Sequence, residues 1–527
     1  MDVASESGVH FQHVAGNSGD YAFPEIMGSG VALFDADGDG DLDLYALQGG
    51  SRAEPALSNR YFRNDSSDGV LRFVDATESS GLADRGYSTG VATGDIDNDG
   101  DVDLVVTAFG PNHLYRNNGA GVFALVGDAL LTGESEGWTT SASFADVDGD
   151  GDLDLFMTDY VAFTSGNNIR CNSANGERDY CAPTTYPPTV DQLWRNDGDG
   201  QFTNISDESG IASAAGNGLG ASAADFDGDG DVDIFVANDQ MENRLWTQGA
   251  DGRFSDTALM AGTAYNGNGA AEASMGVTAG DYDGDGDEDL FMTHLAAETN
   301  TLYANDGSGN FFDVTDSANL GAPSLRLTGF GTGWIDYDND GHLDLFIANG
   351  AVTVVDDAQA NPDFPYGQPN QLLRNEQQRF VEASREAGVV MQRRDVSRGA
   401  AFGDVDNDGD VDVVVSNANG PLQLLRNDLI SDNGSLQLTL QGTTSARDGS
   451  GARVVARLTD GRELWRRAHS DGSYQSASDG RITLGLGNSD VADLAVFWPL
   501  GRAERFDVPP SSRRLSLVEG TGVAVAD

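Results

Sequence analysis

Short apolar runs separated by polar, glycine-rich turns make up most of this 527-residue chain. Segments such as Leu42-Asp43-Leu44-Tyr45 and Val411-Asp412-Val413-Val414-Val415 are too short for helices. They are also rich in aliphatic and β-branched residues, as is typical of strands. No run of about 18 apolar residues occurs, so we expect no transmembrane segment. The pattern predicts an all-β protein built from many short strands.

A loop rich in aspartate and glycine precedes each of seven such strands. Asp occupies positions 1, 3, 5 and 9 of the loop, and Gly occupies position 6. A second β-prone run ends where the loop begins, so each loop should connect two consecutive strands. This run usually opens with a glycine five residues before the loop: Gly30, Gly90, Gly220, Gly276, Gly331 and Gly399, with Ser141 as the exception. The aspartates of the seven loops are Asp35, Asp37, Asp39 and Asp43; Asp95, Asp97, Asp99 and Asp103; Asp146, Asp148, Asp150 and Asp154; Asp225, Asp227, Asp229 and Asp233; Asp281, Asp283, Asp285 and Asp289; Asp336, Asp338, Asp340 and Asp344; and Asp404, Asp406, Asp408 and Asp412.

Carboxylates that converge on one tight turn form a cage of oxygen ligands for a hard cation. The glycine at position 6 permits the sharp reversal that would let the backbone carbonyl of position 7 join them. Calcium fits better than magnesium, because it accepts about six to eight oxygens at variable angles. We therefore predict about seven Ca²⁺ ions, one per loop. The residues at position 7 are Asp41, Asp101, Asp152, Asp231, Asp287, His342 and Asp410.

Two other interpretations of the loop are disfavoured. An EF-hand needs a glutamate at position 12 and helices on both sides, but position 12 holds Ala46, Val106, Met157, Val236, Met292, Ile347 and Val415. Asp-Gly hairpin turns without metal are the second alternative. They need only one or two aspartates, and four converging carboxylates repel one another.

Two further phrases recur after the loops, the second of them in all units but the seventh, and complete a four-stranded unit. Leu114-Tyr115-Arg116-Asn117 exemplifies the first, which a glycine-rich turn and a phenylalanine usually follow, as in a hairpin. The second is Phe73 to Leu82 in the first unit. The seventh unit lacks it, but Asp2 to Val9 resembles Asp75 to Leu82, so the N-terminus should supply the missing outer strand. We predict a seven-bladed β-propeller over residues 1–430.

The C-terminal part of the chain has a different texture. Residues 435–527 contain no aspartate loop, and runs such as Leu436-Gln437-Leu438-Thr439-Leu440 alternate like half-buried strands. We expect a separate small all-β domain, of the sandwich type.

The chain is strongly acidic and contains only two cysteines. Its formal net charge of −55 makes nucleic acid a poor partner, because like charges repel. Cys171 and Cys181 lie ten positions apart in a polar stretch. We interpret them as one disulfide formed in an oxidising compartment, with two free thiols as the alternative.

The aspartate loops resemble the FG-GAP/VCBS repeats of integrin α-chain propellers, in which such loops hold calcium. The phrases Phe23-Pro24-Glu25-Ile26-Met27-Gly28-Ser29-Gly30, Gly442 to Val454 and Trp498 to Glu504 resemble the cartilage acidic protein family, whose propeller is followed by an ASPIC/UnbV domain. This resemblance implies a secreted calcium-binding protein located outside the cell, in the periplasm or at the cell surface. The chain departs from the repeat at Glu288, where the other loops have Leu or Val, and at His342, which would contribute only its backbone.

Irregular insertions interrupt the repeat on what should be the face opposite the loops. Residues 163–191 and 351–370 carry Tyr180, Tyr186, Phe364 and Tyr366, our candidate contact residues for an extracellular protein or polysaccharide. The alternative is that these insertions only cover the mouth of the ring. A calcium-dependent enzyme acting on polysaccharides, as lyase or hydrolase, and an accessory protein of a secreted or biosynthetic pathway are the other functional hypotheses; no catalytic residues are assigned.

Overall fold

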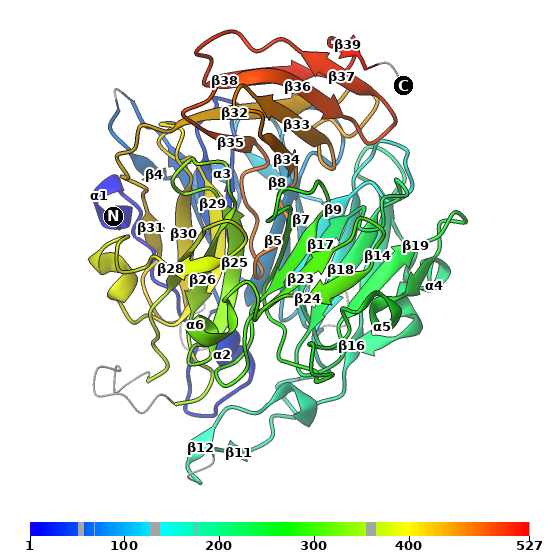
Figure 1. Cartoon of the computed structure of the whole chain (residues 1–527). Coiled ribbons are helices and arrows are strands. Elements are labelled where there is room, and N and C mark those ends of the chain that lie inside the picture. The colour runs from blue at the N-terminus through cyan, green and yellow to red at the C-terminus, as the bar shows by residue number, and fades with distance from the viewer. Residues whose placement is uncertain (51–56, 68, 127–136, 174–175, 355–364, 526–527) are drawn as a thin grey trace.

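A computed structural model describes residues 1–50, 57–67, 69–126, 137–173, 176–354 and 365–525. In these ranges the chain up to about residue 430 forms six antiparallel sheets of four strands and a seventh of three strands (Figure 1). This confirms the predicted all-β class. The sheets are β1 (Val31–Phe34), β2 (Asp43–Ala46), β3 (Arg60–Asn64) and β4 (Phe73–Asp75); β5 (Ser88–Gly94), β6 (Asp103–Ala108), β7 (His113–Asn117) and β8 (Phe123–Leu125); β9 (Thr139–Ala145), β10 (Asp154–Asp159), β14 (Gln192–Asn196) and β15 (Phe202–Asn204); β17 (Gly218–Ala224), β18 (Asp233–Asn238), β19 (Arg244–Gln248) and β20 (Phe254–Asp256); β21 (Val277–Gly280), β22 (Asp289–Met292), β23 (Thr301–Asn305) and β24 (Phe311–Asp313); β25 (Gly329–Ile335), β26 (Asp344–Asn349), β27 (Gln371–Asn375) and β28 (Phe380–Glu382); and β29 (Ser397–Gly403), β30 (Asp412–Asn417) and β31 (Gln423–Leu425).

The sheets are arranged in a closed ring. The first strand of each sheet lies against the first strand of the next, in the order β1, β5, β9, β17, β21, β25 and β29, and β29 returns to β1. The N-terminus closes the seventh sheet. The amide of Val3 donates to the carbonyl oxygen of Leu424 at 2.8 Å, and the amide of Arg426 donates to that of Met1 at 2.8 Å. Both ends of the ring are therefore joined within one sheet.

Short helices, one hairpin and one further two-stranded sheet lie between the main sheets. The helices are α1 (Ala4–Ser7), α2 (Pro24–Met27), α3 (Thr77–Ser80), α4 (Ser206–Ser209), α5 (Ala258–Ala261) and α6 (Gly321–Ser324), with 3-10 turns η1 (Pro183–Thr185), η2 (Ile211–Ser213) and η3 (Val389–Gln392). The hairpin joins β11 (Cys171–Asn172) and β12 (Arg178–Asp179). The two-stranded sheet pairs β13 (Thr189–Val190) with β16 (Ala215–Gly216), which are not consecutive in the chain. Among the described residues no helix has the length and apolar character needed to cross a membrane.

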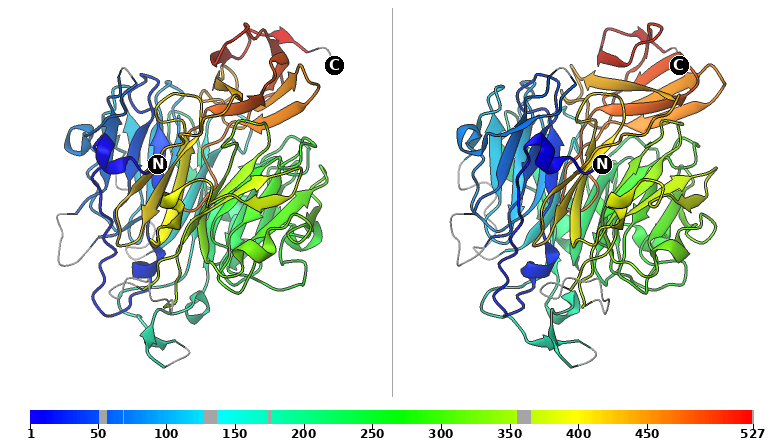
Figure 2. Two further views of the ribbon diagram at one scale, coloured as in Figure 1. Left: turned by 60° about the vertical axis from the view of Figure 1, so that its left-hand side comes forward. Right: turned by 90° about the vertical axis from the view of Figure 1, so that its left-hand side faces the viewer.

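The C-terminal residues form two sheets that enclose one core. Leu438, Val454 and Val496 are fully buried between them, and the pair stands on one end of the ring in all three views (Figures 1 and 2). The sheets are β35 (Ile482–Gly487), β32 (Gly434–Gln441) and β38 (Arg514–Val518), and β34 (Glu463–Arg467), β33 (Arg453–Leu458), β36 (Val491–Phe497), β37 (Ala503–Phe506) and β39 (Val523–Ala524).

One segment of the C-terminal part fills the centre of the ring. We call residues 468–479, which connect β34 to β35, the plug segment. It hydrogen-bonds to the first strand of all seven sheets. The bonds join Ala477 to Val31 and Leu33, Gln475 to Val91 and Ser141, Ser470 to Thr93, Asp471 to Ser143 and Ala223, Ser473 to Val277, Thr332 and Ala400, and Ser478 and Asp479 to Phe402.

The plug segment lies close to two of the glycines that open the first strands. A Cβ atom on Gly30 would lie 1.6 Å from the carbonyl oxygen of Gln475, and one on Gly399 would lie 2.5 Å from the Ser476 hydroxyl. A side chain at Gly30 would therefore displace the backbone of the plug segment. At the third loop, Ser141 replaces glycine, and its hydroxyl accepts the amide of Gln475 at 3.2 Å.

Candidate metal centres

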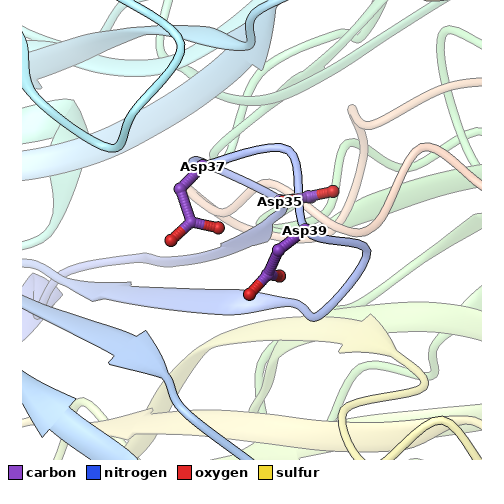
Figure 3. Close-up of side chains that lie close together, drawn as sticks. All are labelled: Asp35, Asp37 and Asp39. Atoms are coloured by element: carbon purple, nitrogen blue, oxygen red, sulfur yellow. The ribbon is translucent and has the colours of Figure 1, made fainter.

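Each aspartate loop lies in the turn between the first two strands of a sheet. In the first sheet β1 ends at Phe34 and β2 begins at Asp43, so the turn carries Asp35, Asp37 and Asp39 (Figure 3). The Asp35 carboxylate accepts the amides of Gly38 and Gly40, both at 2.9 Å. These bonds hold the turn in its sharp conformation, and Gly40 adopts a φ of 91°, which favours glycine.

The loops bring their carboxylates together. Groups of three aspartates with one oxygen each within 4.8 Å of the others occur in the described loops; the named groups are Asp35, Asp37 and Asp39; Asp95, Asp97 and Asp99; Asp146, Asp148 and Asp154; Asp225, Asp227 and Asp229; and Asp281, Asp283 and Asp285. The aspartate at position 3 also has a buried oxygen without a hydrogen-bond partner in five loops: Asp37, Asp97, Asp283, Asp338 and Asp406. Buried carboxylate oxygens need a donor or a cation, so the cages fit a hard metal ion.

The aspartate at position 9 has a second role as the first residue of the second strand. Asp43 is 1% exposed. Its Oδ1 accepts the amide of Asn64 at 2.7 Å, and its Oδ2 accepts the amide of Ala36 at 3.1 Å. Burial is the main cause that raises the pKa of these carboxyls: to about 7 for Asp43 and Asp233, about 8 for Asp103 and Asp154, and about 9 for Asp289. A bound cation would offset this cost of burying charge.

The recurring Asn or Gln at the end of the third strand connects neighbouring loops, a role that sequence reasoning missed. Its side-chain amide donates to the carbonyl of loop position 2 in the preceding sheet, and Asn117 reaches Ala36 in this way at 2.7 Å. The other six bonds join Asn64 to Val405, Asn196 to Ile96, Gln248 to Val147, Asn305 to Phe226, Asn375 to Tyr282 and Asn427 to Tyr337. The sequence did carry a signal for this role, because an Asn or Gln ends the third-strand phrase in all seven units.

The C-terminal sheets cover the side of the ring that carries the loops, which we call the metal face. The Arg481 guanidinium donates to the carbonyl of Gly40 at 3.1 Å, and that of Arg466 donates to the carbonyl of Gly341 at 3.3 Å. Arg514 lies 3.4 Å from a carboxylate oxygen of Asp404. The conformation of the loops is therefore tied to the position of the C-terminal sheets.

The insertion face, opposite the metal face, differs in part from the prediction. Cys171 and Cys181 form the predicted disulfide. Tyr186 and Tyr366 are each only 4% exposed and pack in a core with Phe23 and Trp138, so they stabilise the insertions and do not offer a contact surface. Tyr180 is half-buried, with its hydroxyl 3.3 Å from Glu25. Phe364 lies outside the described residues.

Comparison with known families identifies the repeat. The FG-GAP-like repeat matches residues 35–106, 95–157, 174–236, 225–292 and 281–347, more than half of the chain. The chain belongs to the FG-GAP-like repeat family. The ASPIC and UnbV family matches residues 442–524, so the FG-GAP repeats are followed by an ASPIC/UnbV domain, in the order that the sequence resemblance implies.

Curated relatives align with nearly the whole chain. Cartilage acidic protein 1 of Xenopus tropicalis is 25% identical over 508 residues, which cover 91% of this chain and 71% of the relative. The Homo sapiens protein of the same name is 24% identical over 504 residues, which cover 91% of this chain and 70% of the relative. Among solved structures, an Agrocybe aegerita lectin matches at a TM-score of 0.39 with 16% identity, covering 76% of this chain and 94% of its own. YCF48 bound to D1 peptide matches at 0.42 with 10% identity, covering 77% and 93%.

Proposed function

We propose that this chain is a secreted calcium-binding interaction module in which the calcium is structural. The unpartnered position-3 oxygens and the buried position-9 carboxylates support a cation in each loop. Calcium is the hard cation that tolerates the irregular oxygen cages of short turns. The disulfide supports a compartment outside the cytosol. Calcium would therefore hold the ring in shape, and the partner would bind elsewhere.

Counting bound ions tests the metal assignment. The full chain is freed of metal on a chelating resin and titrated with Ca²⁺ or Mg²⁺ by calorimetry, and bound metal is measured by elemental analysis. We expect about seven Ca²⁺ per chain and weaker binding of Mg²⁺, since the cages lack the rigid octahedral geometry that Mg²⁺ needs. Absence of calcium binding, or a preference for Mg²⁺, would contradict the proposal.

The partner is an extracellular protein or polysaccharide that binds the insertion face. One observation carries this assignment: the ASPIC/UnbV sheets occupy the metal face, whereas the disulfide hairpin β11–β12 projects from the opposite end (Figure 1). Exposed residues beside the hairpin include Ile169, 47% exposed, and Arg170. Exposed residues of irregular loops on a rigid scaffold are typical binding positions.

Paired variants test this face. The calcium-loaded chain is measured by biolayer interferometry against immobilised extracellular-matrix proteins and polysaccharides. We expect the double variant Ile169→Asp, Arg170→Glu to lose roughly tenfold or more in affinity. The matched control is Leu259→Asp, Met260→Asp on α5, where the side chains are 72% and 86% exposed. Equal loss in both variants, or none in the first, would refute the insertion face as the binding site.

A further inference from the structure

A cleft of about 610 Å³ lies between the ASPIC/UnbV sheets and the metal face. Its floor is formed by the loops of the third, fourth and fifth sheets, and its roof by β34 and the end of β36. This volume lies within the roughly 300–1,000 Å³ that is usual for small-ligand sites. The cleft is on the opposite side of the ring from the insertion face, so a ligand here is separate from the partner proposed above.

The cleft exists where the sequence departs from its repeat. At position 8 of most loops an aliphatic side chain fills the junction with the preceding sheet. Leu153 packs beside Gly94, where an added Cβ atom would lie 2.9 Å from Cδ1 of Leu153. Leu42 packs beside Gly403 in the same way. In the fifth loop Glu288 replaces this residue. Its Oε1 accepts a hydrogen bond from Nε of Arg467 at 2.6 Å, and both side chains line the cleft.

Four side chains that line the cleft each carry a buried polar atom without a hydrogen-bond partner. These atoms are Oε2 of Glu288, Nη2 of Arg467, Nε of Arg466 and Nε1 of Trp498. The Arg467 side chain is 7% exposed and Trp498 is 3% exposed, so these groups are buried and oriented by their surroundings. A buried donor or acceptor without a partner is costly, which indicates a ligand that brings both donors and acceptors.

Aromatic rings form the other part of the wall. Trp465 on β34 stacks on Phe497 with 6.1 Å between ring centroids and 22° between planes, and both line the cleft. Trp465 also covers the fifth loop, where a Cβ on Gly286 would come within 3.2 Å of its ring. Such a wall offers a large apolar contact surface beside the polar groups.

We propose that this cleft binds the end of a short, neutral oligosaccharide. A sugar hydroxyl donates one hydrogen bond and accepts two, so one hydroxyl can satisfy both Glu288 and Arg467. Five aspartates of the floor also belong to the proposed cation cages: Asp146, Asp225, Asp281, Asp285 and Asp287. A simple anion would meet the carboxylates of Glu288 and Asp306, and a further simple cation would meet the guanidinium groups of Arg466 and Arg467. The C–H faces of a sugar ring match the aromatic wall, so the donors, acceptors and rings together select a polyhydroxylated, uncharged ligand.

Calorimetric titration of the calcium-loaded full chain with cellotriose, maltotriose, chitotriose, mannotriose and xylotriose tests the proposal. We expect at least one trisaccharide to bind, and Trp465→Ala and Trp498→Phe to weaken it by roughly tenfold or more. Trp498→Phe keeps an aromatic ring but removes the pyrrole ring together with its N–H donor. Glu288→Leu, which restores the aliphatic residue of the other loops, should abolish binding. A melting temperature close to that of the wild type shows that each variant folds.

Three outcomes would overturn the proposal: no trisaccharide binds, binding is unchanged in Trp465→Ala and Trp498→Phe, or trigalacturonate binds in preference to the neutral sugars. Leu259→Ala, on the exposed rim at α5, is the control and should bind as the wild type does. Because the cleft variants leave Ile169 and Arg170 intact, failure here leaves the insertion-face test unaffected. Conversely, loss of trisaccharide binding in the Ile169 and Arg170 variant would place the sugar outside the cleft.

Discussion

Without calcium, the free energy of unfolding of this protein should fall as the pH rises from about 5 to 8. The position-9 aspartates are the cause. Burial raises the pKa of Asp43 to about 7, even though hydrogen bonds from Asn64, Tyr61 and Ala36 oppose the shift. A carboxyl in an unfolded chain has a pKa of about 3.9. Because the folded pKa is the higher one, the carboxyl stabilises the fold below about pH 4, and this contribution is lost as the pH rises through 7.

The size of the effect follows from the shift. A difference of about three pKa units corresponds to about 4 kcal/mol of stability, lost once Asp43 is ionised without a cation. Asp103 and Asp154, whose pKa values are raised to about 8, and Asp289, raised to about 9, add to it. The net stability of a domain is only about 5–15 kcal/mol. Several such carboxylates would therefore exceed it, so at neutral pH the metal-free loops must open or recruit another cation.

Differential scanning calorimetry at pH 5, 6, 7 and 8 measures this directly, with metal-free protein and with protein in excess calcium. We expect the melting temperature of the metal-free protein to fall across this range and that of the calcium-loaded protein to change little. Asp43→Asn is the matched variant, because it removes the buried charge. At pH 8 without calcium, the melting temperature of this variant should equal or exceed that of the wild type. In excess calcium, its melting temperature should be lower than that of the wild type. A metal-free melting temperature that stays constant or rises with pH would refute the reasoning.

Two further predictions concern the centre of the ring. Tyr474 in the plug segment is fully buried, and its hydroxyl donates to the carbonyl of Met27 at 3.2 Å. In denaturant titration Tyr474→Ala should cost about 3–5 kcal/mol and Tyr474→Phe only about 1 kcal/mol; equal losses would contradict the packing role. Arg398, also fully buried, donates to the carbonyls of Ile26, Gly350, Ser397 and Ala351 and lies 3.9 Å above the Phe330 ring. Arg398→Met leaves these carbonyls unpaired, at about 1–3 kcal/mol each, so an unchanged unfolding midpoint would contradict this account.

The repeated features were predictable because local sequence determines them. The aspartate loops, the strands beside them and the pairing of Met1–Val3 with the seventh sheet all follow from phrases that recur along the chain. A turn of this kind needs only its own residues: Asp35 holds the amides of Gly38 and Gly40 within six consecutive positions. The tertiary context then adds little to the conformation of each loop.

The plug segment was not predictable, because its partners are spread over the whole chain. Its sequence, from Ala468 to Asp479, is polar and rich in serine, as in a surface turn. The bonds it makes go largely to backbone groups of the seven first strands, and backbone groups leave no residue-specific signal. Tyr186 and Tyr366 were misread for a related reason: aromatic residues in an irregular insertion indicate equally a binding surface and a buried cluster, and only the packing against Phe23 decides.

The hydrogen bonds of the metal face imply that the seven loops are coupled. Asp43 accepts the amide of Ala36, and the carbonyl of Ala36 accepts the side chain of Asn117, whose own backbone amide donates to Asp103. The same sequence of bonds passes from each loop to the next around the ring, so each position-9 carboxylate is connected to its neighbours through one amide side chain. Hydrogen bonds in such chains polarise one another. A cation that fixes one loop therefore also fixes the carbonyl on which the next sheet depends, and filling one site should favour filling the adjacent ones.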